Sequence, residues 1–184
     1  MTARAHGYTL IEILITVSLA VILLVLAAPS YVEFLNNSRI RNAGEAMLNG
    51  VRLAQTAAVR SNTQTQLIVN PAAGWTIAYV NPDTSVAAPV PPAPYSLQDG
   101  ARGATVLPWP AGATQITFDG FGRLVANPDA SQTISCIAIT TSNIIGPRKL
   151  NVVISNNGLQ TGTKLCDPAV PATEPQACPA NACS

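Results

Sequence analysis

The first 62 residues of the chain divide into two stretches with different patterns of hydrophobic and polar positions. Residues 8–28 read YTLIEILITVSLAVILLVLAA, in which 13 of 21 residues are Leu, Ile or Val and the only charged side chain is Glu12. At a rise of about 1.5 Å per residue, a helix of this length covers roughly the 30 Å hydrocarbon core of a bilayer. The sequence therefore predicts a membrane-spanning helix at residues 8–28.

Glu12 is the one residue that opposes insertion of this helix. The aliphatic residues favour insertion by roughly 0.3 to 0.6 kcal/mol each, about 4 to 8 kcal/mol in all, whereas one carboxylate costs at most about 3 kcal/mol. Two simpler interpretations remain open. A cleaved secretory signal ending in Leu26-Ala27-Ala28 would be shorter than this stretch, since its apolar region usually has about 7–15 residues. A plain membrane anchor would not require an acid.

Residues 29–62 show the pattern of an amphipathic helix. Apolar side chains recur three, four or seven positions apart, and polar side chains occupy the other positions. The apolar stripe consists of Ile40, Met47, Val51, Ala54 and Ala58. Gly44 and Gly50 weaken the helix by about 1 kcal/mol each relative to Ala, and Ser61-Asn62 is the predicted end. We expect the stripe to pack against the remainder of the protein.

Beyond residue 62 the sequence predicts short strands separated by turns. Runs rich in β-branched and aromatic residues alternate with Gly, Pro, Asn and Asp, as in antiparallel hairpins. The predicted strands are residues 64–70, 75–80, 115–118, 123–126, 133–140, 149–155 and 159–165, and the predicted turns are 71–74, 119–122 and 157–158. Five prolines in residues 82–94 predict a loop, and the Pro/Ala-rich residues 167–184 predict an extended tail. The expected fold class is α+β, with the long helix packed on a small antiparallel β-rich head at residues 63–166.

The net charge and the cysteines of the chain say little about its partners and more about its compartment. Ten Lys and Arg residues against nine Asp and Glu give a formal net charge of +1, which offers no general argument for a nucleic-acid or acidic-lipid partner. The four cysteines lack the CxxC or Cys/His spacing of a metal site, and they predict disulfides in an oxidising compartment. They are Cys136, Cys166, Cys178 and Cys183. Three pairings are open; Cys178 with Cys166 or with Cys183 is favoured, because either bond would staple the tail.

The N-terminal segment HGYTLIEILITVSLAVILLVLAAPSY, residues 6–31, resembles the class III signal of type IV pilins and pseudopilins. In that family a short basic leader ends in Gly, and prepilin peptidase cleaves directly after it. The resemblance implies that residues 1–7 are the leader, that cleavage falls between Gly7 and Tyr8, and that Tyr8 is N-methylated. The TLIE sequence that follows fits the family, Tyr8 replaces its usual Phe, and Pro29 matches a proline common in pilin helices.

The same resemblance implies a role for Glu12. A carboxylate within a membrane is costly when alone and tolerated when paired. In the family, the fifth residue of the mature chain pairs with the N-terminal amine of a neighbouring subunit; the alternative is an acid that merely reaches the membrane surface. The implied partners are other pilin or pseudopilin subunits, prepilin peptidase and the inner-membrane assembly platform. The implied location is the bacterial inner membrane, with one span, the head in the periplasm, and a filament after assembly.

The sequence from Asn36 to Val69, NNSRIRNAGEAMLNGVRLAQTAAVRSNTQTQLIV, resembles the GspH/FimT branch of minor pilins and pseudopilins. That branch often has an Arg- and Ala-rich helix ending in an Ala-Val-x-Arg-like segment before a strand. GWTIAYV and ITFDGFGRL fit later strands of the branch. The resemblance implies a structural subunit of a type IV pilus or of a type II secretion pseudopilus. A single-pass anchored periplasmic binding domain that never polymerises is an alternative.

This interpretation predicts a protein that is not an enzyme and that uses no cofactor or metal. The one histidine, His6, lies in the implied leader, so the mature chain would lack a Ser-His or Cys-His pair. The acids of the head are isolated beside turn-forming residues. GFGR, residues 120–123, has one Gly-x-Gly and no helix after it, unlike a phosphate-binding motif.

DNA binding is a further alternative, because FimT proteins are associated with DNA uptake through a Gly-Arg-x-Arg-like motif. The corresponding residues 158–161 read GLQT, without the arginines. Arg148, Lys149 and Lys164 are the remaining candidates for a basic patch. Each phosphate contact adds only a modest, salt-screened contribution, so three cations would make a weak site.

Overall fold

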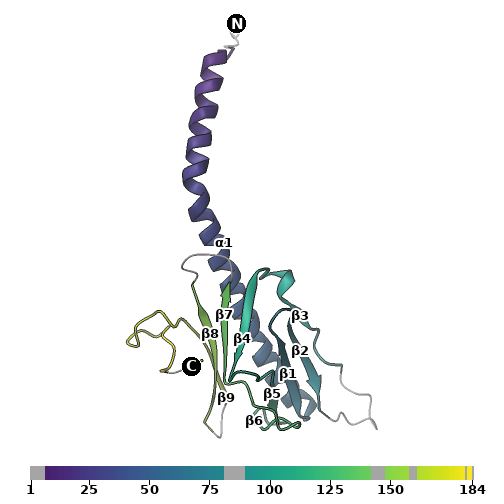
Figure 1. The fold of residues 1–184 in the computed structure, drawn as a ribbon. Coiled ribbons are helices and arrows are strands. Elements are labelled where there is room, and N and C mark those ends of the chain that lie inside the picture. The colour runs from purple at the N-terminus through teal and green to yellow at the C-terminus, as the bar shows by residue number, and fades with distance from the viewer. Residues whose placement is uncertain (1–6, 81–89, 142–147, 158–160, 181, 184) are drawn as a thin grey trace, which may run out of the picture. The chain divides into compact units, whose positions relative to one another are not determined.

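The computed structural model describes residues 7–80, 90–141, 148–157, 161–180 and 182–183 (Figure 1). The chain divides into two compact units, Met1–Leu35 and Asn36–Ser184. The first unit contains the apolar part of one long helix. The second contains the rest of that helix and all of the described strands.

The helix α1 (Leu10–Ser61) has 52 residues and covers both helical stretches expected from the sequence. Thr9 precedes it, and the Thr9 hydroxyl accepts a hydrogen bond from the Glu12 N–H (3.3 Å), which satisfies one of the free donors of the first turn. Pro29 lies inside the helix. Among the described residues, α1 is the one helix long and apolar enough to cross a membrane, and its most apolar stretch is exposed throughout.

Within the second unit, α1 packs on the strands through the predicted stripe, whose side chains are fully buried. These are Ile40, Met47, Val51, Ala54 and Ala58. The helix ends at Ser61 because Asn62 adopts a left-handed backbone conformation (φ 48°). The N–H groups of Asn62 and Thr63 then donate to the carbonyls of Val59 (3.3 Å) and Ala58 (3.2 Å), which is a Schellman ending.

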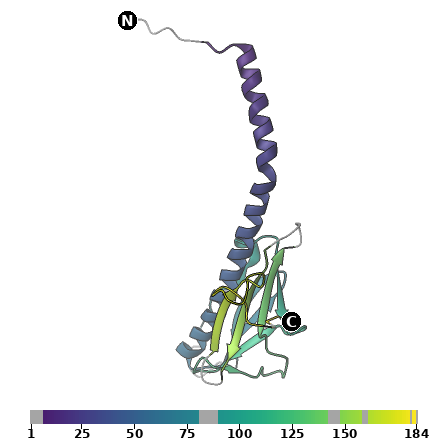
Figure 2. The same ribbon diagram turned by 90° about the vertical axis from the view of Figure 1, so that its left-hand side faces the viewer.

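The described strands form two antiparallel sheets that share a core with α1 (Figures 1 and 2). The first sheet has the order β3-β2-β1-β5-β6, with β1 (Thr65–Asn70), β2 (Gly74–Tyr79), β3 (Tyr95–Ser96), β5 (Gln115–Phe118) and β6 (Leu124–Val125). The second has the order β4-β7-β8-β9, with β4 (Ala104–Trp109), β7 (Cys136–Thr141), β8 (Leu150–Asn156) and β9 (Thr161–Cys166). A short 3-10 helix, η1 (Leu97–Asp99), follows β3. The α+β prediction is confirmed.

The strand pairs of the three predicted hairpins are present, as β1 paired with β2, β5 paired with β6, and β8 paired with β9. The strands β7, β8 and β9 begin one to three residues later than predicted. The sequence did not predict β3, β4 or η1. Gly158 of the turn predicted at residues 157–158 and most of the loop predicted at residues 82–94 lie outside the described residues.

Gly44 and Gly50 explain how α1 comes close to the sheets. Both are buried, and a Cβ on Gly44 would lie 3.0 Å from Leu165 Cδ1 and 3.5 Å from Ile139 Cδ1. The two glycines weaken the helix locally, as the sequence indicated, but they also remove side chains from the surface that meets the strands.

The prediction of an extended tail is wrong. Disulfides join Cys166 to Cys178 and Cys136 to Cys183, so the expected disulfides are present and Cys166 is the partner of Cys178. The Asp167 N–H donates to the Gln176 carbonyl (2.9 Å), and the tail lies beside β8 and β9 in both views (Figures 1 and 2). Covalent bonds and backbone pairing therefore fold back a segment whose Pro/Ala composition alone favours extension.

Candidate functional site

The predicted cleavage site lies just before α1. Gly7, Tyr8 and Thr9 are outside the helix, and Tyr8 is 79% exposed. A Cβ placed on Gly7 would have no atom within 4 Å. Exposed, non-helical backbone near a terminus is where proteolysis is easiest. The local geometry is therefore compatible with the predicted cut between Gly7 and Tyr8.

Glu12 differs from the other polar side chains of the first unit's apolar segment. The Thr16 hydroxyl donates to the Ile13 carbonyl (2.9 Å), and the Ser18 hydroxyl donates to the Leu14 carbonyl (2.7 Å). These hydroxyls are satisfied by their own helix. The Glu12 side chain is exposed in the first turn, and no described residue forms an ion pair with it.

The three candidate DNA-binding cations do not form a free basic patch. Arg148 Nε lies 3.1 Å from Asp167 Oδ2, and the Asp167 side chain is 94% buried. Lys164 Nζ donates to the Ala177 carbonyl (2.8 Å). Lys149 is exposed. Two of the three cations therefore hold the tail in place, and the structure gives no specific support to DNA binding at these residues.

Several of the isolated acids shape turns. Three of them accept the backbone N–H of the residue two positions later, as in Asx-turns. The pairs are Asp119–Phe121 (3.0 Å), Asp129–Ser131 (3.0 Å) and Asp167–Ala169 (2.9 Å). Among the residues that the structure describes, no group of three or more His, Cys, Asp or Glu side chains could hold a metal ion.

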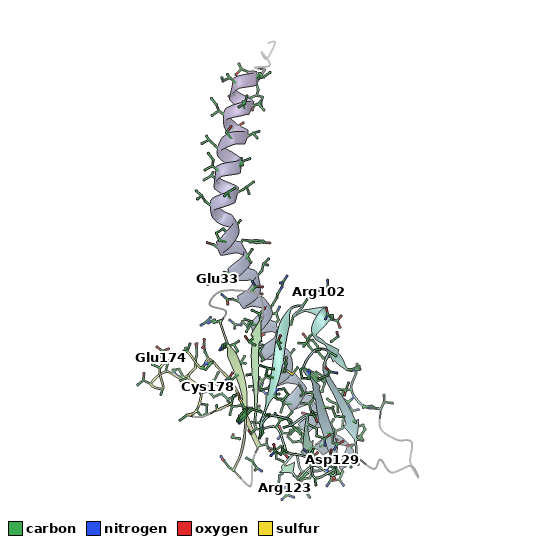
Figure 3. All side chains as sticks on the ribbon, viewed as in Figure 1. Glu33, Arg102, Arg123, Asp129, Glu174 and Cys178 are labelled. Atoms are coloured by element: carbon green, nitrogen blue, oxygen red, sulfur yellow. A yellow bond between two sulfur atoms is a disulfide. The ribbon has the colours of Figure 1, made fainter. Side chains whose placement is uncertain are left out.

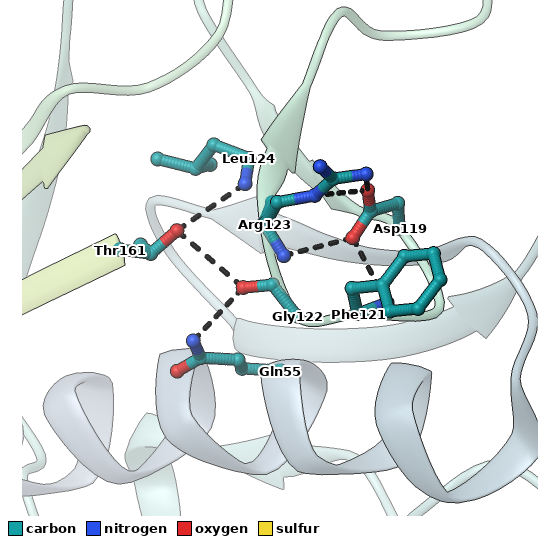
Figure 4. A network of polar contacts seen from close by, with 7 residues as sticks. All are labelled: Gln55, Asp119, Phe121, Gly122, Arg123, Leu124 and Thr161. Atoms are coloured by element: carbon teal, nitrogen blue, oxygen red, sulfur yellow. Dashed lines mark hydrogen bonds and ion pairs between the residues drawn. The ribbon is translucent and has the colours of Figure 1, made fainter. Parts of the chain in front are cut away.

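The turn between β5 and β6 is held by several hydrogen bonds from its own residues and from other elements (Figure 4). Asp119 Oδ1 accepts the N–H groups of Phe121 (3.0 Å) and Arg123 (2.9 Å), and Asp119 Oδ2 accepts Arg123 Nε (2.9 Å). Burial alone would raise the pKa of Asp119, but the Arg123 side chain and the two backbone donors outweigh it and lower that pKa below its usual value. The carboxylate is therefore the anchor of the turn.

The same turn is tied to two other elements. The Gly122 carbonyl accepts Gln55 Nε2 of α1 (2.9 Å) and the Thr161 hydroxyl of β9 (3.4 Å). The Leu124 N–H donates to the Thr161 hydroxyl (3.2 Å). Figure 4 shows these contacts converging on one short segment, which fixes the turn against the helix and against the second sheet.

Phe121 is displayed by this rigid turn. Its side chain is 78% exposed, and the Arg123 guanidinium carbon lies 5.1 Å from the ring centroid. The sequence predicted a hairpin turn at residues 119–122 and excluded a phosphate motif in GFGR, but its pattern did not single out Phe121. A large apolar residue between two glycines in a predicted hairpin turn is the signal that could have identified it.

Comparison with known proteins gives one family. Residues 43–158 match the family described as type II transport protein GspH. The crystal structure of the type IV minor pilin FimU of Pseudomonas aeruginosa (strain PAO1) is similar at 17% sequence identity, covering 71% of this chain and 92% of that chain, with a TM-score of 0.44. No curated protein matches the chain significantly.

Proposed function

Because the chain belongs to the GspH family of pilin-like proteins, we propose that it is a minor pilin or pseudopilin that is cleaved between Gly7 and Tyr8 and assembled into a filament. Proteins of this family are structural subunits, and several polar side chains of the second unit hold turns or the tail. Prepilin peptidase would remove residues 1–7, and methylation would fall on the new N-terminal residue, Tyr8.

Glu12 is the observation that carries the proposal. It is the only charged side chain between Tyr8 and Val32, and its carboxylate has no ionic partner among the described residues. A membrane helix tolerates such a group when a counter-charge is supplied. A neighbouring subunit's N-terminal amine would supply it, so assembly would give this carboxylate an ionic partner that no described residue provides.

The start of the helix supports this role. Thr9 caps the N–H of Glu12, so the helix begins two residues after the proposed new N-terminus. The amine of Tyr8 would therefore stand at the exposed end of the first turn, where a neighbouring carboxylate can reach it. Cleavage would create the amine, and for this reason processing must precede assembly.

The membrane location follows from the same segment. α1 is long and apolar enough for one crossing, and we propose that it anchors the chain in the inner membrane with the second unit in the periplasm. Disulfides between Cys136 and Cys183 and between Cys166 and Cys178 are consistent with an oxidising compartment. An inner-membrane assembly platform would then receive the processed subunit.

The N-terminus of the chain tests the proposal. The full-length protein, tagged at its C-terminus, is purified from matched cells with and without prepilin peptidase, and its N-terminal peptide is identified by mass spectrometry. With the peptidase we expect a chain that begins at N-methylated Tyr8; without it, we expect residues 1–7 to be retained. An unprocessed chain in cells that contain the peptidase would refute the proposal.

A further inference from the structure

The C-terminal part of α1 leaves one face uncovered. Its exposed residues are two arginines, two aliphatic residues and one threonine, with no acid among them. They are Arg52, Leu53, Thr56, Val59 and Arg60. Helical spacing places them on one side, away from the buried stripe. Leu53 and Val59 are 41% and 51% exposed, so apolar and cationic groups alternate on this surface.

Elements of the first sheet flank this face on both sides. On one side, the Phe121 turn packs against the helix: a Cβ on Gly122 would lie 3.0 Å from Val59 Cγ2, and one on Gly120 would lie 2.6 Å from Asn62 Oδ1. The two glycines thus let the turn approach the helix closely.

On the other side, a groove of about 540 Å³ separates the helix from β2 and from the segment before β3. Leu53, Thr56 and Arg60 line it from the helix, and Tyr79, Val90 and Pro92 line it from the opposite wall. The exposed helix face is therefore bounded by an aromatic projection and by an apolar groove.

Phe121 has the properties of an interface anchor. Aromatic residues and Arg are enriched at interfaces. The hydrogen bonds of Asp119 already fix the turn, so binding would require little further ordering of the backbone. A large exposed apolar side chain on a fixed turn can therefore contribute more of its buried area to affinity than one on a loose loop.

Charge indicates the kind of partner. Asp119 is bonded to Arg123, whereas no described residue forms an ion pair with Arg52 or Arg60. A complementary surface would present acidic groups beside an apolar patch. Two cations without an ion-pair partner in the described part of the chain, next to three apolar side chains, suit a protein better than a nucleic acid, whose phosphates require several cations acting together.

We propose that this docking face (Arg52, Leu53, Thr56, Val59, Arg60 and Phe121) binds the head of another pilin-type subunit, through acidic and apolar side chains of that subunit. The proposal rests on the proposed function, because filament assembly brings heads of different subunits together. To the proposed function this inference adds the surface of the head that binds the neighbouring subunit. It also adds the kinds of side chain, acidic and apolar, that the neighbour must present.

Site-specific photocrosslinking in cells that assemble the chain tests the docking face. The full-length protein carries benzoylphenylalanine in place of Phe121, or in place of Leu107 of β4 as the matched control, since Leu107 is an exposed apolar residue (50%) outside the face. We expect a product from position 121, identified by mass spectrometry as a different protein with a pilin-type N-terminus, and at least about tenfold less product from position 107.

A charge reversal tests the electrostatic part. Arg60→Glu in the photocrosslinking chain is expected to lower the product about tenfold, whereas Arg102→Glu is expected to leave it unchanged. Arg102 is an exposed arginine that Figure 3 shows at the opposite end of the second unit from Arg123. Charges at the edge of an interface mainly change the association rate, and salt screens them. The loss of product caused by Arg60→Glu should therefore become smaller as the salt concentration is raised.

The outcomes separate this inference from the proposed function. A chain that is cleaved after Gly7 and incorporated, yet gives no product at position 121, overturns the docking face alone. A product with nucleic acid, or only with a second copy of the chain, also overturns it. A chain that is not cleaved overturns the proposed function and the docking face together.

Discussion

The indole ring of Trp75 lies directly on the backbone of Gly50. A Cβ on Gly50 would lie 2.6 Å from Trp75 Cε2, and Trp75 Nε1 donates to the Ala46 carbonyl (3.2 Å). The ring also stacks on Tyr95, with 5.9 Å between the two centroids. One aromatic side chain of β2 thereby fixes the position of α1 on the first sheet, and only glycine leaves room for it.

We therefore expect Gly50→Ala to destabilise the protein although alanine is the better helix former. Alanine would gain about 1 kcal/mol in helix propensity, but overpacking against a rigid ring costs about 1–3 kcal/mol. The difference, a net loss of up to about 2 kcal/mol, should appear in thermal unfolding of the full-length chain in detergent.

Gly44→Ala is the matched control for that change. Its nearest neighbour is the flexible end of Leu165, which can move by a few tenths of an ångström, so its effect should lie between zero and a stabilisation of about 1 kcal/mol. Equal destabilisation by both substitutions would show that the Trp75 ring has no special role.

Asp119→Asn should loosen the Phe121 turn. The substitution weakens the charge-assisted hydrogen bonds of the carboxylate, which are typically worth about 1.5–3 kcal/mol each. Hydrogen exchange at the amides of Phe121 and Arg123 should become faster, while exchange in β1 should stay unchanged. Unaltered protection at those two amides would contradict the anchoring role of Asp119.

The stability of the turn should depend on pH with a definite sign. The pKa of Asp119 is lower in the folded chain than its ordinary value of 3.8. The carboxylate therefore contributes stability that is complete above that value and is lost as the pH falls through the lower, folded pKa. The free energy of unfolding, measured between pH 6 and pH 2 to bracket this range, should decrease less on acidification in Asp119→Asn than in the wild type.

Asp129→Asn is the comparison variant. The pKa of Asp129 is also lowered, by hydrogen bonds from the hydroxyl and the backbone N–H of Ser131.

The two disulfides should differ in their contribution to stability. They close loops with sequence separations of 47 (Cys136–Cys183) and 12 (Cys166–Cys178). Loop-closure entropy predicts about 4 and about 3 kcal/mol respectively. The Cys136→Ser/Cys183→Ser variant should therefore unfold at a lower temperature than the Cys166→Ser/Cys178→Ser variant.

Limited proteolysis should locate the effect of losing both bonds. Cleavage is expected within residues 167–184, with the earlier part of the chain protected. Early cleavage within β1 or β2 would contradict the assignment of the disulfides to the tail.

The sequence predicted the elements whose determinants are local. The apolar stripe from Ile40 to Ala58 follows from helical spacing, and the β5–β6 hairpin follows from its Asp-Gly-Phe-Gly turn. The strand β4 escaped prediction because Pro108 and Pro110 suggest a break. In the fold β4 lies at the edge of its sheet, where a residue without an N–H is tolerated.

Features that depend on distant contacts could not be predicted. The tail is folded back by two disulfides, and the positions of four cysteines in the sequence do not determine how they pair. It is also held by the Arg148–Asp167 ion pair, which joins residues 19 positions apart. The display of Phe121 depends on Gln55 and Thr161, which are more than 30 residues from the turn in sequence. At the N-terminus, Glu12 could be identified from the composition of the apolar segment. Its partner could not be identified, because the proposed partner belongs to another subunit.

Incorporation of Glu12→Ala into filaments tests the account most directly. The variant, compared with Thr16→Ala, is expressed in cells that assemble the wild-type chain, and its amounts in the inner membrane and in the sheared filament fraction are measured. Thr16 is a suitable control because its hydroxyl bonds within its own helix. Removing one partner of a buried ion pair costs about 3–5 kcal/mol, so we predict normal membrane insertion of both variants and a loss of Glu12→Ala from filaments of at least about a hundredfold. Equal incorporation of Glu12→Ala and wild type would contradict the account.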